Sequence, residues 1–237
     1  MSLMVINEDH YINQILHDAG TYRLTVDEFD TPYVALVLRT FVDPGDVEDL
    51  AAVHALQDGL VLEANSDTPF THPDYDEEDR KATAEALLAL AKGIPDSRGT
   101  FGSKDEVNPI RHLIGTAAGW GGLPESEAFY AIEAEPRPVG HYTLTISDVP
   151  VDGFWSLSIY NRDGFFEQNL YDSYSLNNLT ATPEEDGSYT LNLAPEPNGL
   201  TNHLYVMDGW NYALRFYRPR TSILDGTWPI PEPPAAS

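Results

Sequence analysis

The sequence has 237 residues, 42% of them hydrophobic, and carries 38 acidic against 13 basic residues for a formal net charge of −25. This length suits one large domain, or one domain with a smaller appendage, and the apolar share is sufficient for a folded core. The charge argues against partners such as nucleic acid and anionic membranes, because phosphate binding depends on clustered lysine and arginine. The absence of cysteine excludes disulfides and thiolate chemistry.

The N-terminus gives no sign of export. No apolar run approaches the roughly 18 residues that a membrane helix needs. The first ten residues, MSLMVINEDH, contain neither the basic nor the apolar segment of a signal peptide. Met1 to Leu3 resembles a leader added by an expression vector, which makes Met4 the simplest natural start. We therefore expect a cytoplasmic protein, with the periplasm as the alternative in case a native signal peptide preceded Met4.

The first forty residues predict one helix and two strands. Residues 4–18 have the spacing of a short amphipathic helix, whereas residues 22–26 and 33–41 read as strands. The second strand is almost entirely apolar over its first six residues, so we expect it at the centre of a sheet.

Three helices should follow. The first is capped by Asp43 or Asp46 and has apolar residues at every third or fourth position: Val47, Leu50, Val53, Leu56 and Leu60. The second spans about residues 77–92, begins behind an acidic run that the helix dipole favours, and ends at Gly93 and Pro95. Its inward residues should be Ala84, Leu87, Leu88 and Ala91.

Asn108-Pro109 is a strong start signal for the third helix, which should end at residues 119–122. Its inward face should hold Ile110, Leu113, Ile114 and Ala117, with Arg111 and His112 beside that face.

The remainder of the chain predicts mainly β-structure. Residues 142–147 and 155–160 each alternate apolar and polar side chains, and we expect them to pair as an antiparallel hairpin. Asp186-Gly187 predicts a second hairpin. Further strands are expected at 128–134, 204–207 and 212–217, followed by a Pro-rich tail. The fold class is therefore α+β: a helical N-terminal part over residues 1–103 and an antiparallel β-sandwich or jelly roll over residues 104–237.

No catalytic or cofactor motif is present. The sequence lacks a G-x-S-x-G elbow, an H-E-x-x-H pair and a G-x-G-x-x-G loop, and its seven histidines are scattered. We therefore predict no metal site and no cofactor, and whether the protein is an enzyme stays open.

A polar surface is the remaining candidate for function. If Trp155, Leu157 and Ile159 face the core, then Ser156, Ser158 and Tyr160 face the other way, and an aromatic and amide-rich loop follows. Two interpretations remain. The aromatic and amide side chains could bind a sugar or another neutral polar ligand, or they could close the end of the sandwich and satisfy turns. Likewise, Arg215 could bind an anion, although pairing with a nearby acid on the outer sheet face is the simpler expectation.

Four segments together resemble the bacterial family called domain of unknown function 1214. They are RHLIGTAAGWGGLPE (111–125), YTLTISDVPVDGFWSLSIYN (142–161), YSLNNLTA (174–181) and GWNYALRFYRPRTSILDGTWPIPEP (209–233). The resemblance covers about Lys104 to Pro233 and implies a jelly-roll-like C-terminal domain.

Larger relatives carry a domain of unknown function 1254 ahead of it. Here the first hundred residues are too short and too helical for that domain, although Pro32 to Ala64 resembles its helical connector. The family implies no reaction and no catalytic residues.

Our leading hypothesis is a soluble bacterial protein that binds a small polar or carbohydrate-like ligand. The candidate binding residues are Arg111, His112, Trp120, Tyr160, Asn161, Tyr174, Asn177, Trp210 and Arg215. One alternative is a hydrolase or lyase with His112 as general base and Arg111 as oxyanion partner. Another is a structural or assembly module that uses the sheet face and the tail. A homodimer is the default expectation for assembly.

The net charge generates the first testable prediction. Since like charges repel across the folded surface and salt screens them, the melting temperature should rise between low salt and about 1 M sodium chloride. Thermal unfolding monitored by circular dichroism checks this. An unchanged melting temperature would contradict it.

Overall fold

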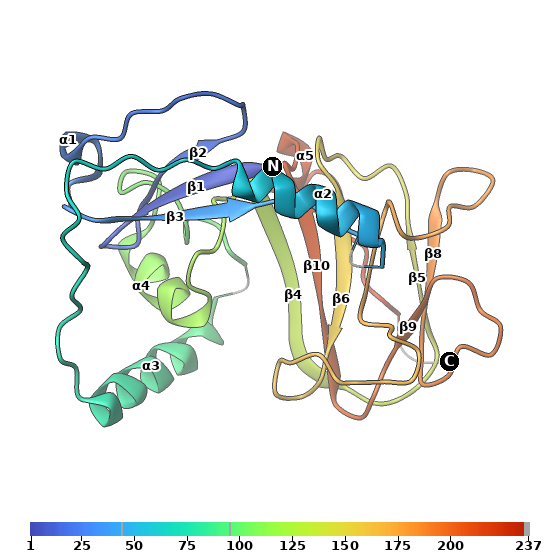
Figure 1. The fold of residues 1–237 in the computed structure, drawn as a ribbon. Coiled ribbons are helices and arrows are strands. Elements are labelled where there is room, and N and C mark those ends of the chain that lie inside the picture. The colour runs from blue at the N-terminus through green and yellow to red at the C-terminus, as the bar shows by residue number, and fades with distance from the viewer. Residues whose placement is uncertain (44, 95, 235–237) are drawn as a thin grey trace. The chain divides into compact units, whose positions relative to one another are not determined.

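The computed structural model describes residues 1–43, 45–94 and 96–234 (Figure 1). The chain forms two compact units, of which the first contains Met1–Gly93 and Gly99–Gly122 and the second Ile94–Arg98 and Leu123–Ser237. Three sheets and several helices confirm the mixed α+β class. The predicted division between residues 103 and 104 stays a prediction. Within the described ranges, no helix is long and apolar enough to cross a membrane.

The first unit contains a three-stranded antiparallel sheet with the order β2-β1-β3. Its strands are β1 (Ser2–Asn7), β2 (Ile12–Leu16) and β3 (Val34–Arg39). The helix predicted for residues 4–18 is therefore wrong. Met4, Val5 and Ile6 are all fully buried, which suits a central strand covered on both faces rather than a one-sided helix. A turn with His10 at φ 67° then reverses the chain.

Two further expectations about this region need correction. The segment predicted as a strand at residues 22–26 has no regular structure before the short helix α1 (Val26–Phe29), which Thr25 and Glu28 start with a capping box. The strand β3 forms as predicted, but it lies at the edge of the sheet while β1 lies at the centre.

The other helices of this unit start where their capping residues predict. They are α2 (Val47–Asp58), α3 (Glu77–Ala91) and α4 (Pro109–Ala118). Asp46, Asp76 and Asn108 each accept hydrogen bonds from the first backbone N–H groups. The proline that follows Asp43 and the predicted stop at residue 95 lie outside the described residues.

The inward faces of these helices differ from the prediction. In α2 Val53 is buried, but Val47 and Leu56 are exposed. The described side chains of α3 are nowhere fully buried. In α4 the expected Ile114 is buried together with His112 and Gly115. Of the other three expected residues, Ala117 is half-buried, while Ile110 and Leu113 are exposed.

The second unit contains two sheets. One has the order β4-β10-β6-β7 and is antiparallel throughout, which confirms an antiparallel C-terminal sheet. In the other, β8 pairs with β5 antiparallel and with β9 parallel. The strands are β4 (Ala128–Arg137), β5 (Tyr142–Ile146), β6 (Trp155–Tyr160), β7 (Ser175–Asn177), β8 (Tyr189–Ala194), β9 (His203–Tyr205) and β10 (Trp210–Tyr217). A short helix, α5 (Thr221–Leu224), follows. One apolar cluster contains side chains from both sheets.

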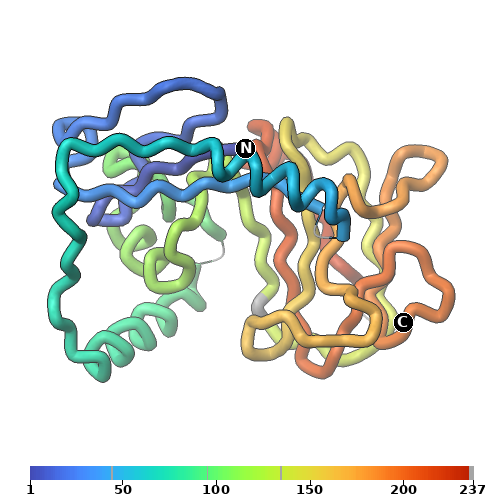
Figure 2. The backbone as a smooth tube through the Cα atoms, in the orientation of Figure 1, coloured from blue at the N-terminus to red at the C-terminus, as the bar shows by residue number. Residues whose placement is uncertain are grey.

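The two predicted hairpins do not form. The path of the chain between these strands can be followed in Figure 2. The strand β5 pairs with β8, whereas β6 pairs with β10 and β7. The Asp186-Gly187 turn does exist, with Gly187 at φ 85°, but it connects strands of different sheets. Alternation fixes which face of a strand is buried and leaves its partner undetermined.

The connection between β5 and β6 crosses from one sheet to the other along the end of β10. Asp152 and Gly153 donate their backbone N–H groups to the carbonyls of Arg218 and Tyr217, at 2.9 and 3.2 Å. A Cβ placed on Gly153 would lie 2.7 Å from the carbonyl oxygen of Tyr217. Glycine is therefore required here by close backbone approach and not by its φ angle.

The tail is partly tied to the second unit. Ile230 packs against the apolar cluster, and Arg137 donates from Nη1 to the carbonyl of Pro233 at 3.0 Å. The end of the predicted Pro-rich tail, residues 235–237, lies outside the described residues.

We expect Gly153→Ala to lower the free energy of unfolding by about 3 kcal/mol, because the new methyl group meets backbone that cannot move without breaking β10. Gly164→Ala is the matched control. Its Cβ meets nothing within 4 Å, so only the φ of 82° opposes it, at about 1 kcal/mol. Urea unfolding of both variants makes the comparison, and equal losses would contradict the steric explanation.

Candidate functional site

The face of the β4-β10-β6-β7 sheet opposite the core carries polar side chains of β6 and β10, of which Ser156 and Ser158 are themselves buried. As predicted, Trp155, Leu157 and Ile159 are buried in the core, so Ser156, Ser158 and Tyr160 lie on the other face. Arg215 of β10 is the register partner of Ser156 and shares that face. We call Arg215, Ser158, Tyr160, Ser175 and Phe166 the Arg215 cluster.

Neighbouring hydroxyls hold the guanidinium of this cluster in place. Arg215 donates from Nη1 to Ser158 Oγ at 3.1 Å and from Nη2 to Tyr160 Oη at 2.6 Å. Its guanidinium carbon also lies 5.6 Å from the centre of the Tyr160 ring, within cation–π range. Arg215 is thus fixed at two nitrogens and half-buried.

An aromatic side chain adjoins this polar group. The ring of Phe166 is stacked on that of Tyr160, with centroids 5.0 Å apart and an interplanar angle of 6°, and Tyr174 lies 5.6 Å from Phe166. Phe166 is 51% exposed. The Asn161 turn starts this loop, since Asn161 Oδ1 accepts from the backbone N–H groups of Asp163 and Phe165. The cluster therefore combines a cation, hydroxyls and an accessible ring face.

Arg215 differs from five other arginines of the chain in its electrostatic surroundings. The five arginines at positions 80, 98, 137, 162 and 220 each form an ion pair with a carboxylate. Within the described ranges, Arg215 forms none, and it donates hydrogen bonds to neutral hydroxyls instead. The expectation that Arg215 pairs with a nearby acid is therefore wrong for this part of the chain.

The other candidate residues of the second unit have different surroundings. Tyr160, Tyr174 and Arg215 come together as described. The side chains of Asn161 and Asn177 satisfy turns, and Asn177 Oδ1 accepts from the backbone of residues 179 and 180. Trp210 is fully buried in the core, where its indole N–H donates to the carbonyl of Pro138 at 3.0 Å.

Arg111, His112 and Trp120 belong to the first unit. That they share one binding site with the candidate residues of the second unit stays a prediction. Trp120 is 61% exposed, whereas His112 is buried. Both ring nitrogens of His112 face backbone carbonyls, Nδ1 at 3.0 Å from Thr100 and Nε2 at 3.3 Å from Asp9. A general base needs a nitrogen directed at substrate, so this arrangement favours a structural role.

His10 was missed by the sequence analysis, which placed it in a helix. Its ring stacks on that of His112, with centroids 5.4 Å apart. His10 Nε2 accepts from the backbone N–H of Gly121 at 2.8 Å, so the neutral ring carries its hydrogen on Nδ1 and donates it to Thr116 Oγ1 at 2.9 Å. Burial first, and repulsion from His112 second, lower the pKa of His10 from 6.5 to about 4. His10 thus joins the β1–β2 turn to α4 and the loop behind it.

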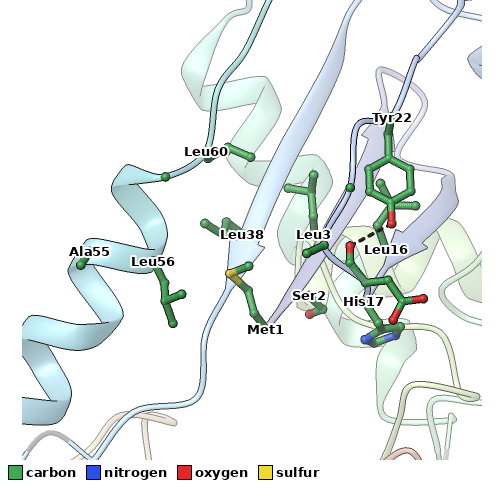
Figure 3. Close-up of a pocket in the computed structure, with 14 residues that line it drawn as sticks. Met1, Ser2, Leu3, Leu16, His17, Tyr22, Leu38, Ala55, Leu56 and Leu60 are labelled. Carbon is green, nitrogen blue, oxygen red and sulfur yellow. Dashed lines mark hydrogen bonds between the residues drawn. The ribbon is translucent and has the colours of Figure 1, made fainter.

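An apolar hollow of about 360 Å³ also lies within the first unit (Figure 3). Five leucines line the hollow. Leu3, Leu16 and Leu38 come from the sheet, Leu56 from α2, and Leu60 from the chain directly after α2. Tyr22 stands at its rim and donates to the carbonyl of Asp18 at 2.8 Å. Few polar groups converge on this hollow, which makes it a weaker candidate than the Arg215 cluster. In the described ranges, no group of three histidine, aspartate or glutamate side chains could hold a metal ion.

Comparison with known proteins supports the family resemblance. Residues 133–221 match the model of the family described as "Protein of unknown function (DUF1214)", which confirms the predicted resemblance over this part of the chain. No curated protein matches the sequence.

Several solved structures match the chain, among them the following two. The VPA0106 protein from Vibrio parahaemolyticus, a structural-genomics target, is 18% identical over the whole chain and 82% of its own length, with a TM-score of 0.60, and so shares the fold. An uncharacterized protein from Burkholderia cenocepacia is 18% identical over 43% of this chain and 28% of its own, with a TM-score of 0.35.

The buried His10 generates a prediction about pH. Because its pKa is lower in the folded chain, the unfolded chain binds the extra proton between pH 6.5 and 4, and stability falls as pH falls through that window. From pH 7 to pH 5 this group should cost about 2 kcal/mol of the free energy of unfolding. The substitution His10→Asn should remove that part of the pH dependence, and asparagine tolerates the left-handed backbone conformation of this position. Urea unfolding at both pH values checks it, and an equal loss in the variant would contradict the assignment.

Proposed function

We propose that the second unit is a binding module for a small polar, carbohydrate-like ligand, which it holds at the Arg215 cluster on a β-sandwich of jelly-roll type. The observation that carries the proposal is the convergence of Arg215 and Tyr160 beside the exposed ring of Phe166. A sugar presents both an apolar ring face and hydrogen-bonding groups, so it needs an aromatic surface and fixed polar groups together.

The rigidity of the cluster supports this role. Ser158 and Tyr160 fix the guanidinium, and stacking with Phe166 fixes the Tyr160 ring, so little side-chain freedom remains to be lost when a ligand binds. The cluster is also built mainly on two paired strands, which position side chains better than a loop.

The enzymatic alternative has less support, because the proposed base His112 is buried and both its ring nitrogens face backbone carbonyls. The assembly module and the homodimer also stay proposals. The surfaces that the sequence suggests for assembly are the tail and the sheet face.

A thermal-shift screen of the purified protein against neutral and acidic monosaccharides tests the proposed function. A ligand at about 100 times its dissociation constant adds roughly 2.7 kcal/mol to the free energy of unfolding. Phe166→Ala should then weaken binding about tenfold, since it removes the stacking surface. Phe165→Ala is the matched control, because Phe165 is its exposed neighbour in the loop. No shift with any sugar, or equal weakening by both variants, would overturn the proposal.

A further inference from the structure

We infer that the group recognised by the Arg215 cluster is a carboxylate on a sugar ring, so that the ligand is a uronic acid rather than a neutral sugar. This inference rests on the proposed function and specifies its ligand class. Three features of the cluster carry it: the direction of its hydrogen bonds, its charge and its aromatic side.

The hydrogen-bond directions follow from the acceptors. Ser175 donates its hydroxyl hydrogen to the carbonyl of Leu157 at 3.0 Å. The 3.0 Å contact between Ser158 and Ser175 is therefore a donation from Ser158. Since Ser158 also accepts from Arg215, its bonds run in one direction, from the guanidinium through two hydroxyls to the backbone.

Arg215 and Tyr160, at the other end of this network, keep hydrogen-bond donors that no protein group in the described ranges uses. Tyr160 Oη accepts from Arg215, and within the described ranges no acceptor takes the hydrogen of this hydroxyl. A guanidinium has five N–H groups, of which two are used by Ser158 and Tyr160. The cluster thus offers several donors to a ligand, and an ionised carboxylate accepts hydrogen bonds without donating any. A sugar hydroxyl, in contrast, would bring a further hydrogen-bond donor to a place that already has donors in excess.

The charge of the cluster points in the same direction. Arg215 is half-buried and, within the described ranges, forms no ion pair, although the chain carries 38 acidic residues. A carboxylate would supply the opposite charge through charge-assisted hydrogen bonds, in the forked geometry that arginine prefers. Only one positive charge is present in the cluster. This one positive charge can balance the single negative charge of a carboxylate. It cannot balance the nearly double negative charge of a phosphate ester, which a chain with net charge −25 would repel further.

The aromatic side of the cluster selects the remainder of the ligand. The ring of Phe166 is half-exposed and stacks on the Tyr160 ring whose hydroxyl belongs to the donor group. A carboxylate bound by Arg215 and Tyr160 would therefore have an aromatic surface beside it, and the C–H face of a pyranose suits that surface. A uronic acid carries both parts in one small molecule.

Glucuronate and glucose form a matched pair of probes, since they differ in the carboxylate. We expect the protein to bind glucuronate about tenfold or more tightly than glucose, as judged by isothermal titration calorimetry with equal sodium chloride in both cells. Tyr160→Phe keeps the ring and removes one donor, so it should weaken glucuronate binding about tenfold and glucose binding far less. Arg215→Gln should remove the preference for glucuronate.

Arg162→Gln is the control for net charge, because Arg162 is an exposed arginine of the same unit that is paired with Asp208. It should leave the preference for glucuronate unchanged. If Arg215→Gln does not fold, Tyr160→Phe still tests the inference.

The outcomes separate the inference from the proposed function. If glucose binds as tightly as glucuronate and Phe166→Ala weakens both, the carboxylate inference is wrong and the proposed function stands. Tighter binding of inorganic phosphate or glucose 6-phosphate than of glucuronate would overturn the carboxylate as well. If no probe in the sugar panel binds, the proposed function fails together with the inference. A glucuronate preference that Arg162→Gln abolishes equally would assign the effect to net charge and contradict the site.

Discussion

The alternation of side chains along β10 is the constraint on which the second unit depends. The strand pairs with β4 on one side and β6 on the other, and its buried residues Leu214 and Phe216 join the apolar cluster. A period of two then places Arg215, which lies between them in sequence, on the opposite face. The core and the candidate site are thus fixed by one strand, so a change in its register would remove both together.

A half-buried guanidinium that has no counter-charge among the described residues is a cost to stability that the cluster only partly offsets. Hydrogen bonds to Ser158 and Tyr160 and the nearby aromatic ring compensate some of the lost hydration. Where a fold keeps such a charge although acids are abundant in its sequence, an anionic ligand explains the arrangement better than structure alone does. The Arg215 cluster therefore connects the composition of the chain with its proposed function.

The first unit uses buried polar groups for a different purpose. His10 and His112 stack on each other, and their ring nitrogens contact backbone or hydroxyl groups from the β1–β2 turn, α4 and its flanking loops. Three of these contacts join the β1–β2 turn to α4 and the loop after it, far apart in sequence, so the histidines fix the packing of this unit. The lowered pKa of His10 is a consequence of that role, since burial disfavours the charged ring and His112 repels it.

The sequence by itself determined what depends on neighbouring residues. The helix starts at Asp46, Asp76 and Asn108, the placement of Ser158 and Tyr160 on the strand face opposite the core, and the family resemblance all follow from local pattern. The first strand was mistaken for a helix because spacing does not show burial on both faces. Strand partners, the burial of His112 and the neutral hydroxyls that Arg215 contacts depend on residues distant in the chain. Only the tertiary structure decided them, because periodicity specifies a face and carries no information about which surface will cover it.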